Sequence, residues 1–381
     1  MARKPIEIIN KAYDCLLKYG VATIVCKARL NDYNFDYSAK ANGEDEWYKK
    51  WSKLGKTNKK WYRLYSSFIG KDMNIVPDDI MSNVIEPILN PVRYRSLYED
   101  KNLLDNFFMT QFKESITPPT LLRCINGAIY TETFEFIDEN RATLLLSDYK
   151  AKKLISKASI DENSSRGIYF WEKDGAEYRL INQDIVLSIE NLKNLYPSGN
   201  FILQEVAVQS EWMNHLCPTS VNTLRIHMYR SVIDNKPHLV NAVVRIGKDG
   251  SLVDNAHAGG VWCGIRKDGT LLDFVIDQYA NTQTQFNGID FSKEKLQVPN
   301  WGKIEAFCEK VLLSLTHMRN LALDVMIDKD GNPKIIEYNT DKFSTFFYQL
   351  TTSSVFDEYT DEVFEYCRKN IENATRIFVT F

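Results

Sequence analysis

The sequence predicts an α+β protein whose strands are mostly antiparallel. Short apolar runs of strand length alternate with Asn-Gly and Asp-Gly turns, which is the pattern of β-hairpins. Longer segments with helical spacing of apolar residues interrupt these strands, as in WGKIEAFCEKVLLSLTHMRN at 301–320. Runs of strands interleaved with helices are typical of the α+β class.

The first region, residues 1–98, is mainly helical in pattern and polar, with an aromatic-rich stretch, EWYKKWSKLGKTNKKWYRLYSSF. Trp47, Trp51, Tyr62 and Tyr65 recur there at helical spacings. Such a stripe favours packing in a core over a platform on which nucleic-acid bases stack.

The second region, residues 99–205, begins the strand-rich part of the chain. TLLRCINGAIY predicts two strands joined by a turn at Asn126 and Gly127. NFILQEVAV is an apolar strand interrupted by Gln204 and Glu205. Because unpaired polar groups are costly inside a buried strand, this pair indicates a role other than packing in the core.

The third region, residues 206–381, reads as a run of hairpins, with one helix before the last hairpin and a terminal helix after it. The tripeptide Lys-Asp-Gly occurs three times, at 248–250, 267–269 and 329–331. Asp-Gly tolerates the positive φ of tight turns, so these tripeptides indicate shared turn chemistry and not a repeat.

The last hairpin, LALDVMIDKDGNPKIIEYNT, carries polar residues among apolar ones. A turn centred on Asp330 and Gly331, or a symmetric four-residue loop, places Asp324 opposite Glu337, and Asn339 shares the face of Glu337. Facing carboxylates repel unless something compensates. Two carboxylates and an amide oxygen suit Mg²⁺. An exposed hairpin face, or a register shifted by one residue, is the alternative.

The composition argues against several functional classes. The 381 residues include 47 Lys and Arg against 50 Asp and Glu, without a long basic block, so a nucleic-acid partner is not expected. The seven cysteines are scattered and form no zinc or disulfide pattern, which favours reduced thiols. The sequence contains no secretory signal and no transmembrane segment, and it therefore predicts a cytoplasmic protein.

Seven motifs, in order between about residues 85 and 345, resemble those of the sugar-transfer-associated ATP-grasp family. They are YEDKNLLDNFF, LLRCINGAIY, KLISKASIDENSSRGIYFWE, NFILQEVAV, SVNTLRIHMYR, NAHAGGVWCGI and ALDVMID with PKIIEYNT. The resemblance implies an ATP-grasp fold, with ATP between two antiparallel-sheet-plus-helix lobes. The N-terminal lobe would be 99–205 and the C-terminal lobe 206–381, preceded by the helical region 1–98.

The resemblance also implies nucleotide-binding residues. Lys101 resembles the lysine that enters the nucleotide pocket, and Lys157 resembles the strand lysine that contacts the α-phosphate and adenine, although either could be a surface lysine. The loop with Ser164 and Ser165 stands where the family has a glycine-rich flap, and a solvent-exposed turn is the alternative. The backbone from Gln204 through Glu205 and Val206 to Ala207 would hold the adenine edge.

For the chemistry itself, Arg225 resembles the arginine that holds the transferred phosphate, with a structural ion pair as the alternative. Asp324, Glu337 and Asn339 resemble the ligands of one or two Mg²⁺ ions, for which Mn²⁺ could substitute. Residues assigned more loosely to the substrate are His215, Asn222, His257, Gly259 and Gly260.

The function expected from this resemblance is an ATP-dependent carboxylate–amine ligase that works through an acylphosphate. The expected substrates are an amino acid and a sugar acid, amino sugar or sugar nucleotide of capsule or O-antigen biosynthesis. The alternatives are a small-molecule kinase on the same scaffold and a nucleotide-binding module without turnover. The sequence leaves the oligomeric state open.

Overall fold

The computed structural model describes residues 22–108, 111–160 and 167–374, which fall into two compact units. Unit 1 draws on Met1–Ser96, Glu211–Met326 and Tyr338–Phe381, and unit 2 on Leu97–Ser210 and Ile327–Glu337. The N-terminal helices thus share a unit with most of the C-terminal half, while the division of the chain into three regions stays a prediction.

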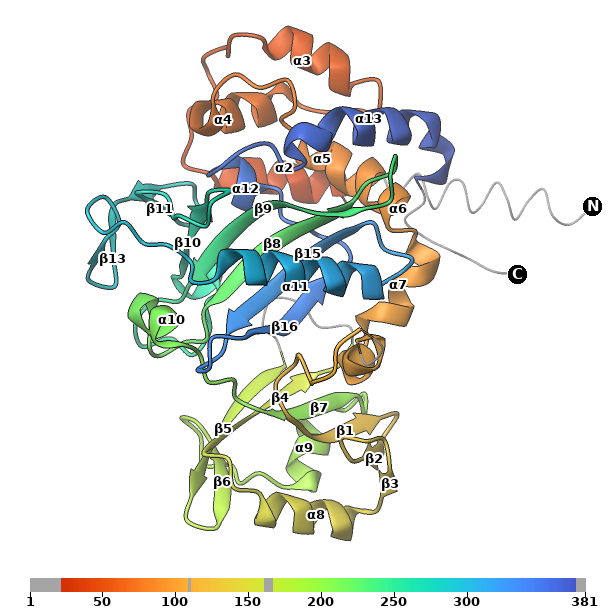
Figure 1. The fold of residues 1–381 in the computed structure, drawn as a ribbon, viewed down its shortest axis with the longest axis vertical. Helices are drawn as coiled ribbons and strands as arrows, with labels where there is room; N and C mark the ends of the chain where they lie inside the picture. Colours follow the sequence, from red (N-terminus) through yellow and green to blue (C-terminus); the bar gives the residue numbers. More distant parts are fainter. Residues whose placement is uncertain (1–21, 109–110, 161–166, 375–381) are drawn as a thin grey trace, which may run out of the picture. The chain divides into compact units, whose positions relative to one another are not determined.

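Unit 2 is built on a seven-stranded antiparallel sheet with strand order β3-β2-β1-β7-β4-β5-β6 (Figure 1). Its strands are β1 (Thr120–Ile125), β2 (Ala128–Tyr130), β3 (Phe136–Ile137), β4 (Lys153–Ala158), β5 (Ile168–Asp174), β6 (Glu177–Leu180) and β7 (Phe201–Glu205). Its helices are η3 (Lys101–Phe107), α8 (Glu139–Asp148) and α9 (Ile189–Leu195), while α7 (Val92–Glu99) runs from unit 1 into unit 2.

Local chemistry explains where these elements begin. Asn126 and Gly127 turn between β1 and β2 with φ of 49° and 82°, so the hairpin predicted there is confirmed. Asp138 caps α8 by accepting a hydrogen bond from the amide of Arg141, and Ser188 caps α9 in the same way. Both helices pack their apolar residues into one core with the sheet.

A second seven-stranded sheet, with strand order β12-β11-β10-β9-β8-β15-β16, lies mainly in unit 1, while residues 327–337, which include most of β16, are assigned to unit 2. Its strands are β8 (Thr223–Arg230), β9 (Pro237–Ile246), β10 (Val261–Ile265), β11 (Val275–Ile276), β12 (Thr282–Gln283), β15 (Asn320–Ile327) and β16 (Pro333–Asn339). A separate small pair is β13 (Gln285–Phe286) with β14 (Ile289–Asp290). The predicted α+β class with mostly antiparallel strands is therefore confirmed.

The helices of unit 1 lie on both sides of this sheet. α11 (Trp301–Ser314), predicted from its apolar spacing, contacts β8 and β9 (Figure 1). The helices N-terminal to the first sheet are α2 (Ala22–Asp32), α3 (Glu44–Trp51), α4 (Lys59–Ile69), α5 (Asp78–Ile80), η2 (Met81–Ile85) and α6 (Glu86–Leu89). The later ones are α10 (Glu211–Leu216), η4 (Ala256–Ala258), α12 (Phe346–Gln349), η5 (Asp357–Tyr359), α13 (Thr360–Lys369) and η6 (Ile371–Asn373).

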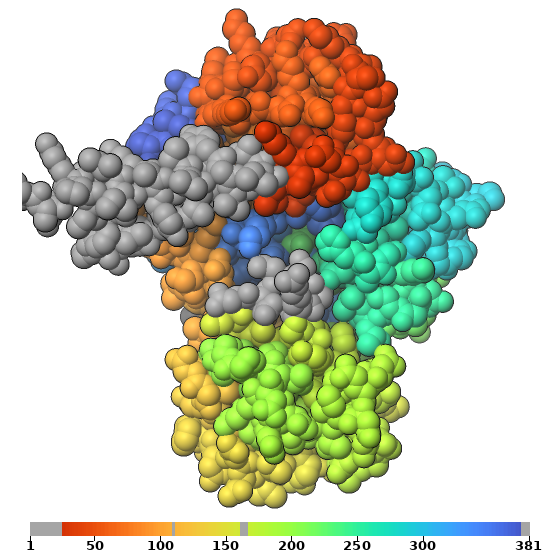
Figure 2. All heavy atoms as spheres, turned by 180° about the vertical axis from the view of Figure 1, so that it is seen from behind, coloured from red at the N-terminus to blue at the C-terminus, as the bar shows by residue number. Residues whose placement is uncertain are grey.

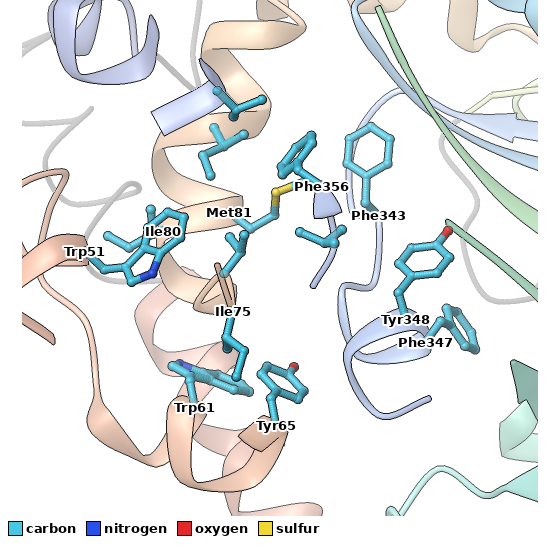
Figure 3. Close-up of a cluster of buried hydrophobic side chains, with 14 of the residues drawn as sticks. Trp51, Trp61, Tyr65, Ile75, Ile80, Met81, Phe343, Phe347, Tyr348 and Phe356 are labelled. Carbon is cyan, nitrogen blue, oxygen red and sulfur yellow. The ribbon is translucent and has the colours of Figure 1, made fainter. Parts of the chain in front are cut away.

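One hydrophobic core joins the N-terminal helices to the sheet and to the segment after β16. Trp47, Trp51, Tyr62 and Tyr65 are fully buried in it, which confirms that the aromatic stripe packs in a core. Figure 3 shows Trp61 and Tyr65 in the same cluster as the aromatic side chains of residues 343–356. Gln349 adds two buried hydrogen bonds, since its side chain accepts from the amide of Val76 at 2.7 Å and donates to the Val76 carbonyl at 2.8 Å.

The N-terminal segment also reaches the edge of the sheet. Asn34 donates its backbone amide to the carbonyl of Tyr279 at 2.8 Å and its side-chain amide to Asn281 at 2.9 Å. In Figure 2 the red N-terminal residues accordingly lie beside the cyan residues of this edge. Residues 22–96 are thus a structural layer of unit 1.

All three Lys-Asp-Gly turns place their glycine at positive φ, with 83° at Gly250, 85° at Gly269 and 78° at Gly331. The register predicted for the last turn is nevertheless wrong. Asp328 donates its amide to the carbonyl of Asn332 at 2.8 Å, which closes a three-residue loop instead of the expected symmetric one. The pairing is therefore shifted by one residue at the turn, and the facing of Asp324 and Glu337 no longer follows from it.

Candidate active site

Two lysines predicted to bind the nucleotide and Glu337, predicted to hold Mg²⁺, gather in unit 2. Lys157 lies on β4 with only 8% of its surface exposed. Lys101 begins η3, and its amide donates to the carbonyl of Ser159 at 2.9 Å, which ties it to the end of β4. Lys101 Nζ lies 3.4 Å from Oε1 of Glu337.

Burial sets the electrostatics of this group. It lowers the pKa of Lys157 from 10.5 to about 8; Glu337 opposes the shift, and Lys101 adds to it. A bound anion stabilises the charged form of a buried ammonium of this kind, because its negative charge replaces the water that burial removed. The cluster is therefore suited to a phosphate group.

The strand predicted to hold adenine has its polar side chains fixed. Gln204 donates Nε2 to the carbonyl of Pro118 and to Thr120, both at 3.2 Å. The Tyr149 hydroxyl donates to Oε1 of Glu205 at 2.8 Å. This hydrogen bond orients a carboxylate that could accept from an amino group.

The backbone after β7 is largely engaged with neighbouring strands. The amide of Glu205 donates to the Pro119 carbonyl at 2.9 Å, and that of Val206 donates to the Lys153 carbonyl at 3.2 Å. A ligand edge bound here would thus use the carbonyls of this segment or the following residue, Ala207, where the chain has left the strand.

Unit 1 holds a second charged cluster, centred on Asp324 of β15. Arg225 of β8 lies directly opposite Asp324 in the sheet, with Nε 3.2 Å from Oδ1. Arg245 of β9 approaches the other oxygen, with Nη1 3.3 Å from Oδ2. Nη2 of Arg245 also lies 2.9 Å from Oδ1 of Asp254 and 2.6 Å from the Asn255 side chain.

This cluster is buried and contains polar groups suited to a ligand. The Arg225 guanidinium lies 5.6 Å from the ring centre of Phe347. Within residues 22–108, 111–160 and 167–374, buried Nη1 of Arg225 and Nδ2 of Asn339 make no hydrogen bond. Orphaned buried donors of this type are costly, and a bound phosphate group would satisfy a guanidinium.

The predicted metal ligands fit Mg²⁺ by their chemistry, because carboxylate and amide oxygens are the donors that this ion takes. The part of the chain that the structure describes contains no group of three or more His, Cys, Asp or Glu side chains arranged to hold a metal. Asp324 and Asn339 belong to unit 1 and Glu337 to unit 2, and each Asp324 oxygen lies within 3.3 Å of an arginine, so the set of three ligands stays a prediction.

The looser substrate assignments lie in structural settings. His215 Nε2 is 3.1 Å from Glu294 and His257 Nδ1 is 2.6 Å from Gln278, both on exposed surface. The buried Asn222 side chain donates to the carbonyls of Met213 and Cys217. None of these hydrogen bonds joins Arg225 or Asp324, so a role in substrate binding stays a prediction.

The glycine pair next to His257 is explained by its own backbone. Gly259 ends η4 with φ of 85°. A Cβ at Gly260 would stand 2.8 Å from the Asp254 carbonyl oxygen and 2.9 Å from that of Asn255. Glycine here lets the chain pass close to the residues that hold Arg245.

Ser164 and Ser165, predicted to lie in the flap over the phosphates, are outside the described residues.

The sequence reasoning missed Arg245 and Tyr149. An arginine inside the apolar run NAVVRI was a usable signal, since a charge in a buried strand needs a partner. Tyr149 had no such signal, because its partner Glu205 lies 56 residues away.

Two compact units and two seven-stranded antiparallel sheets with helices match the architecture expected from the sequence. The sequence profile described as sugar-transfer associated ATP-grasp matches residues 81–363. The chain belongs to this family. No curated protein matches the sequence.

Several solved structures are distantly similar. The ATP-grasp ligase PsnB, complexed with a phosphomimetic precursor variant, Mg and ADP, is 11% identical over 73% of this chain and 61% of that chain, with a TM-score of 0.39. The D-cycloserine synthetase DcsG is 11% identical over 74% of this chain and 73% of that chain, with a TM-score of 0.40. An L-amino acid ligase from Bacillus licheniformis is 10% identical over 70% of this chain and 47% of that chain, with a TM-score of 0.38.

The chain covers only about three fifths of the length of the first of these structures, at 61% and 63%.

Among the described helices of the chain, none has the length and apolarity needed to cross a membrane.

Proposed function

We propose that the protein is an ATP-dependent carboxylate–amine ligase that forms an amide through an acylphosphate. The observation that carries this proposal is the buried Lys157 beside Lys101 and Glu337, in a chain of the ATP-grasp family. A lowered lysine pKa in such surroundings marks a candidate functional site. Burying a cation lowers the stability of the fold unless the charge is paired. The phosphate groups of ATP would provide such a pairing.

In the proposed reaction, a substrate carboxylate attacks the γ-phosphorus of ATP and releases ADP. An amine then attacks the acyl carbon of the acylphosphate, phosphate leaves, and the ammonium that forms loses its proton. No enzyme nucleophile is required.

Each cluster has a separate task in this proposal. Lys157 and Lys101 bind phosphate oxygens of ATP, and Glu205, oriented by Tyr149, accepts from the adenine amino group. Mg²⁺ bound by Asp324, Glu337 and Asn339 would neutralise charge on the β- and γ-phosphates. Arg225, held by Asp324, stabilises the charge that develops on the transferred group.

The family description supports a substrate linked to sugar transfer. We therefore infer that an amino acid and a sugar acid, amino sugar or sugar nucleotide are joined, in capsule or O-antigen biosynthesis.

The decisive experiment is a screen for ADP release with pairs of amino acids and uronic acids or nucleotide sugars, followed by the mass of the product. A ligase releases ADP and phosphate only when carboxylate and amine are both present, and the product gains an amide. A phosphorylated product without amine dependence would indicate the kinase. Tight ATP binding without ADP release across the screen would indicate a nucleotide-binding module.

A further inference from the structure

A cavity lies in the N-terminal helical part of unit 1, and none of the residues assigned above lines it. Its volume is about 460 Å³, and its walls come from α2, α4 and the loop that precedes α4, with one residue each from α3 and α5. The charged residues that line it are Lys27, Lys56, Lys59, Lys60, Arg63 and Asp79.

Three of these five cations are not neutralised by a carboxylate ion pair. Arg63 is paired with the buried Glu44, with Nε 2.7 Å from Oε2, and Lys59 is paired with Asp45. Across the described residues, Lys27, Lys56 and Lys60 make no salt bridge, and the Lys60 ammonium lies 4.9 Å from the ring centre of Tyr37.

The remaining carboxylate does not offset these lysines. Asp79 is 6% exposed, and burial raises its pKa to about 7, so part of its negative charge is lost near neutral pH. α4 also begins at Lys59, and the positive end of its helix dipole adds to the positive potential in the cavity. The cavity is therefore strongly electropositive.

We propose that this cavity binds a phosphate-bearing ligand of the size of a sugar phosphate. Three lysines match a phosphate monoester, which carries a charge of about −1.5 to −2, better than they match a single carboxylate. Small-molecule pockets have volumes of about 300–1,000 Å³, so this cavity has room for more than an inorganic ion. The site is separate from the nucleotide site, and the proposal stands whether or not the protein is a ligase.

The test uses the full-length chain and isothermal titration calorimetry with glucose 1-phosphate, inorganic phosphate and glucose. The variant is Lys27→Glu/Lys56→Glu, whose two side chains are both exposed, so the fold is expected to persist. The matched control is Lys53→Glu, an exposed lysine of the same loop that does not line the cavity. Circular dichroism checks the fold of each variant.

We expect saturable, salt-sensitive binding of glucose 1-phosphate, none of glucose, and a loss of affinity of at least about tenfold in the double variant alone. ADP binding should be unchanged in that variant, so that failure of the nucleotide site is recognised separately.

Equal weakening by Lys53→Glu would overturn the proposal, as would the absence of saturable binding of either phosphate compound. Sedimentation with phosphatidylglycerol vesicles tests a lipid headgroup as the source of the phosphate. Vesicle binding without binding of the soluble phosphates would replace the small-molecule site with a membrane-contact surface.

Discussion

Arg225 and Asp324 face each other across β8 and β15 and form an ion pair with 3.2 Å between Nε and Oδ1. Both residues are nearly buried, at 9% and 4% exposure, and Arg245 shares the same carboxylate. The arginine predicted to act on phosphate is thus fixed in place before any ligand binds. Such preorganisation is what electrostatic stabilisation of a transition state requires.

Replacing Arg225 by Ala should slow the chemical step by about a hundredfold or more, because one preorganised donor is lost. It should also lower the free energy of unfolding, since Asp324 loses an ion-pair partner. Single-turnover ADP formation and urea unfolding measure the two effects separately. Arg230→Ala, a buried arginine of the same strand, is the control for stability alone. A change confined to KM would contradict the catalytic role.

Replacing Lys157 by Met should weaken ADP binding at least about tenfold and leave the fold intact, because a neutral side chain of similar length removes the buried charge. Fluorescence titration with a labelled ADP measures this. Lys153→Met is the matched control, since Lys153 lies on the same strand with its side chain 46% exposed. Similar losses in both variants would argue against a specific phosphate contact.

The pKa of Lys157 makes nucleotide binding depend on protons. Since the pKa is lowered to about 8, the free protein has largely lost this proton at pH 9, and a bound phosphate should restore it. ADP binding should therefore take up protons at pH 9 and hardly any at pH 6.5. Calorimetry in two buffers with different ionisation enthalpies measures this uptake, which should be absent in Lys157→Met.

The same shift also has a consequence for stability. Between pH 8 and 10.5 the unfolded lysine binds more protons than the folded one, so this group raises the free energy of unfolding as pH increases through that window. Below pH 8 its destabilising effect is fully present. Lys157→Met should remove this part of the pH dependence.

Replacing Glu337 by Gln should abolish ADP formation, because an amide cannot supply the negative charge that Mg²⁺ needs. The fold should persist, since the Glu337 side chain is 41% exposed. Glu172→Gln is a close control, because Glu172 pairs with Lys153 at the same N–O distance of 3.4 Å in the same unit. Unchanged turnover in Glu337→Gln would remove this residue from the metal assignment.

Replacing Gln349 by Ala should lower the free energy of unfolding by about 3 kcal/mol, because it leaves a buried N–H and a buried C=O of Val76 without partners. Urea unfolding measures the loss. Gln297→Ala, at an exposed glutamine, should change stability by less than about 0.5 kcal/mol. Equal stability of the two variants would show that residues 22–96 are not held through this contact.

Features with local causes could be predicted from the sequence. The turn at Asn126 and Gly127, the glycines of the Lys-Asp-Gly turns and the presence of a helix from Trp301 each depend on neighbouring residues alone, although that helix ends at Ser314 and the predicted segment ran to 320. The aromatic stripe of α3 and α4 was likewise readable as core, because its spacing shows which side of each helix is apolar.

The register of the last hairpin could not be read in this way. The Asp328 side chain accepts from the amides of Asp330 at 3.0 Å and Asn332 at 2.8 Å, which selects the three-residue loop. A prediction that pairs the two strands symmetrically about the turn does not take these side-chain hydrogen bonds into account. The pairing of Arg245 with Asp324 could not be predicted from the sequence either, since the two residues lie 79 positions apart.

The common core of the N-terminal helices and the segment after β16 sets a limit on how the protein can be shortened. A fragment that starts at residue 97 would lack the N-terminal side chains that share one core with Phe343, Phe347 and Phe356, and would leave part of that core exposed to water. Such a fragment should aggregate on expression, and any shortened form of the protein will have to keep residues 22–96 together with the segment after β16.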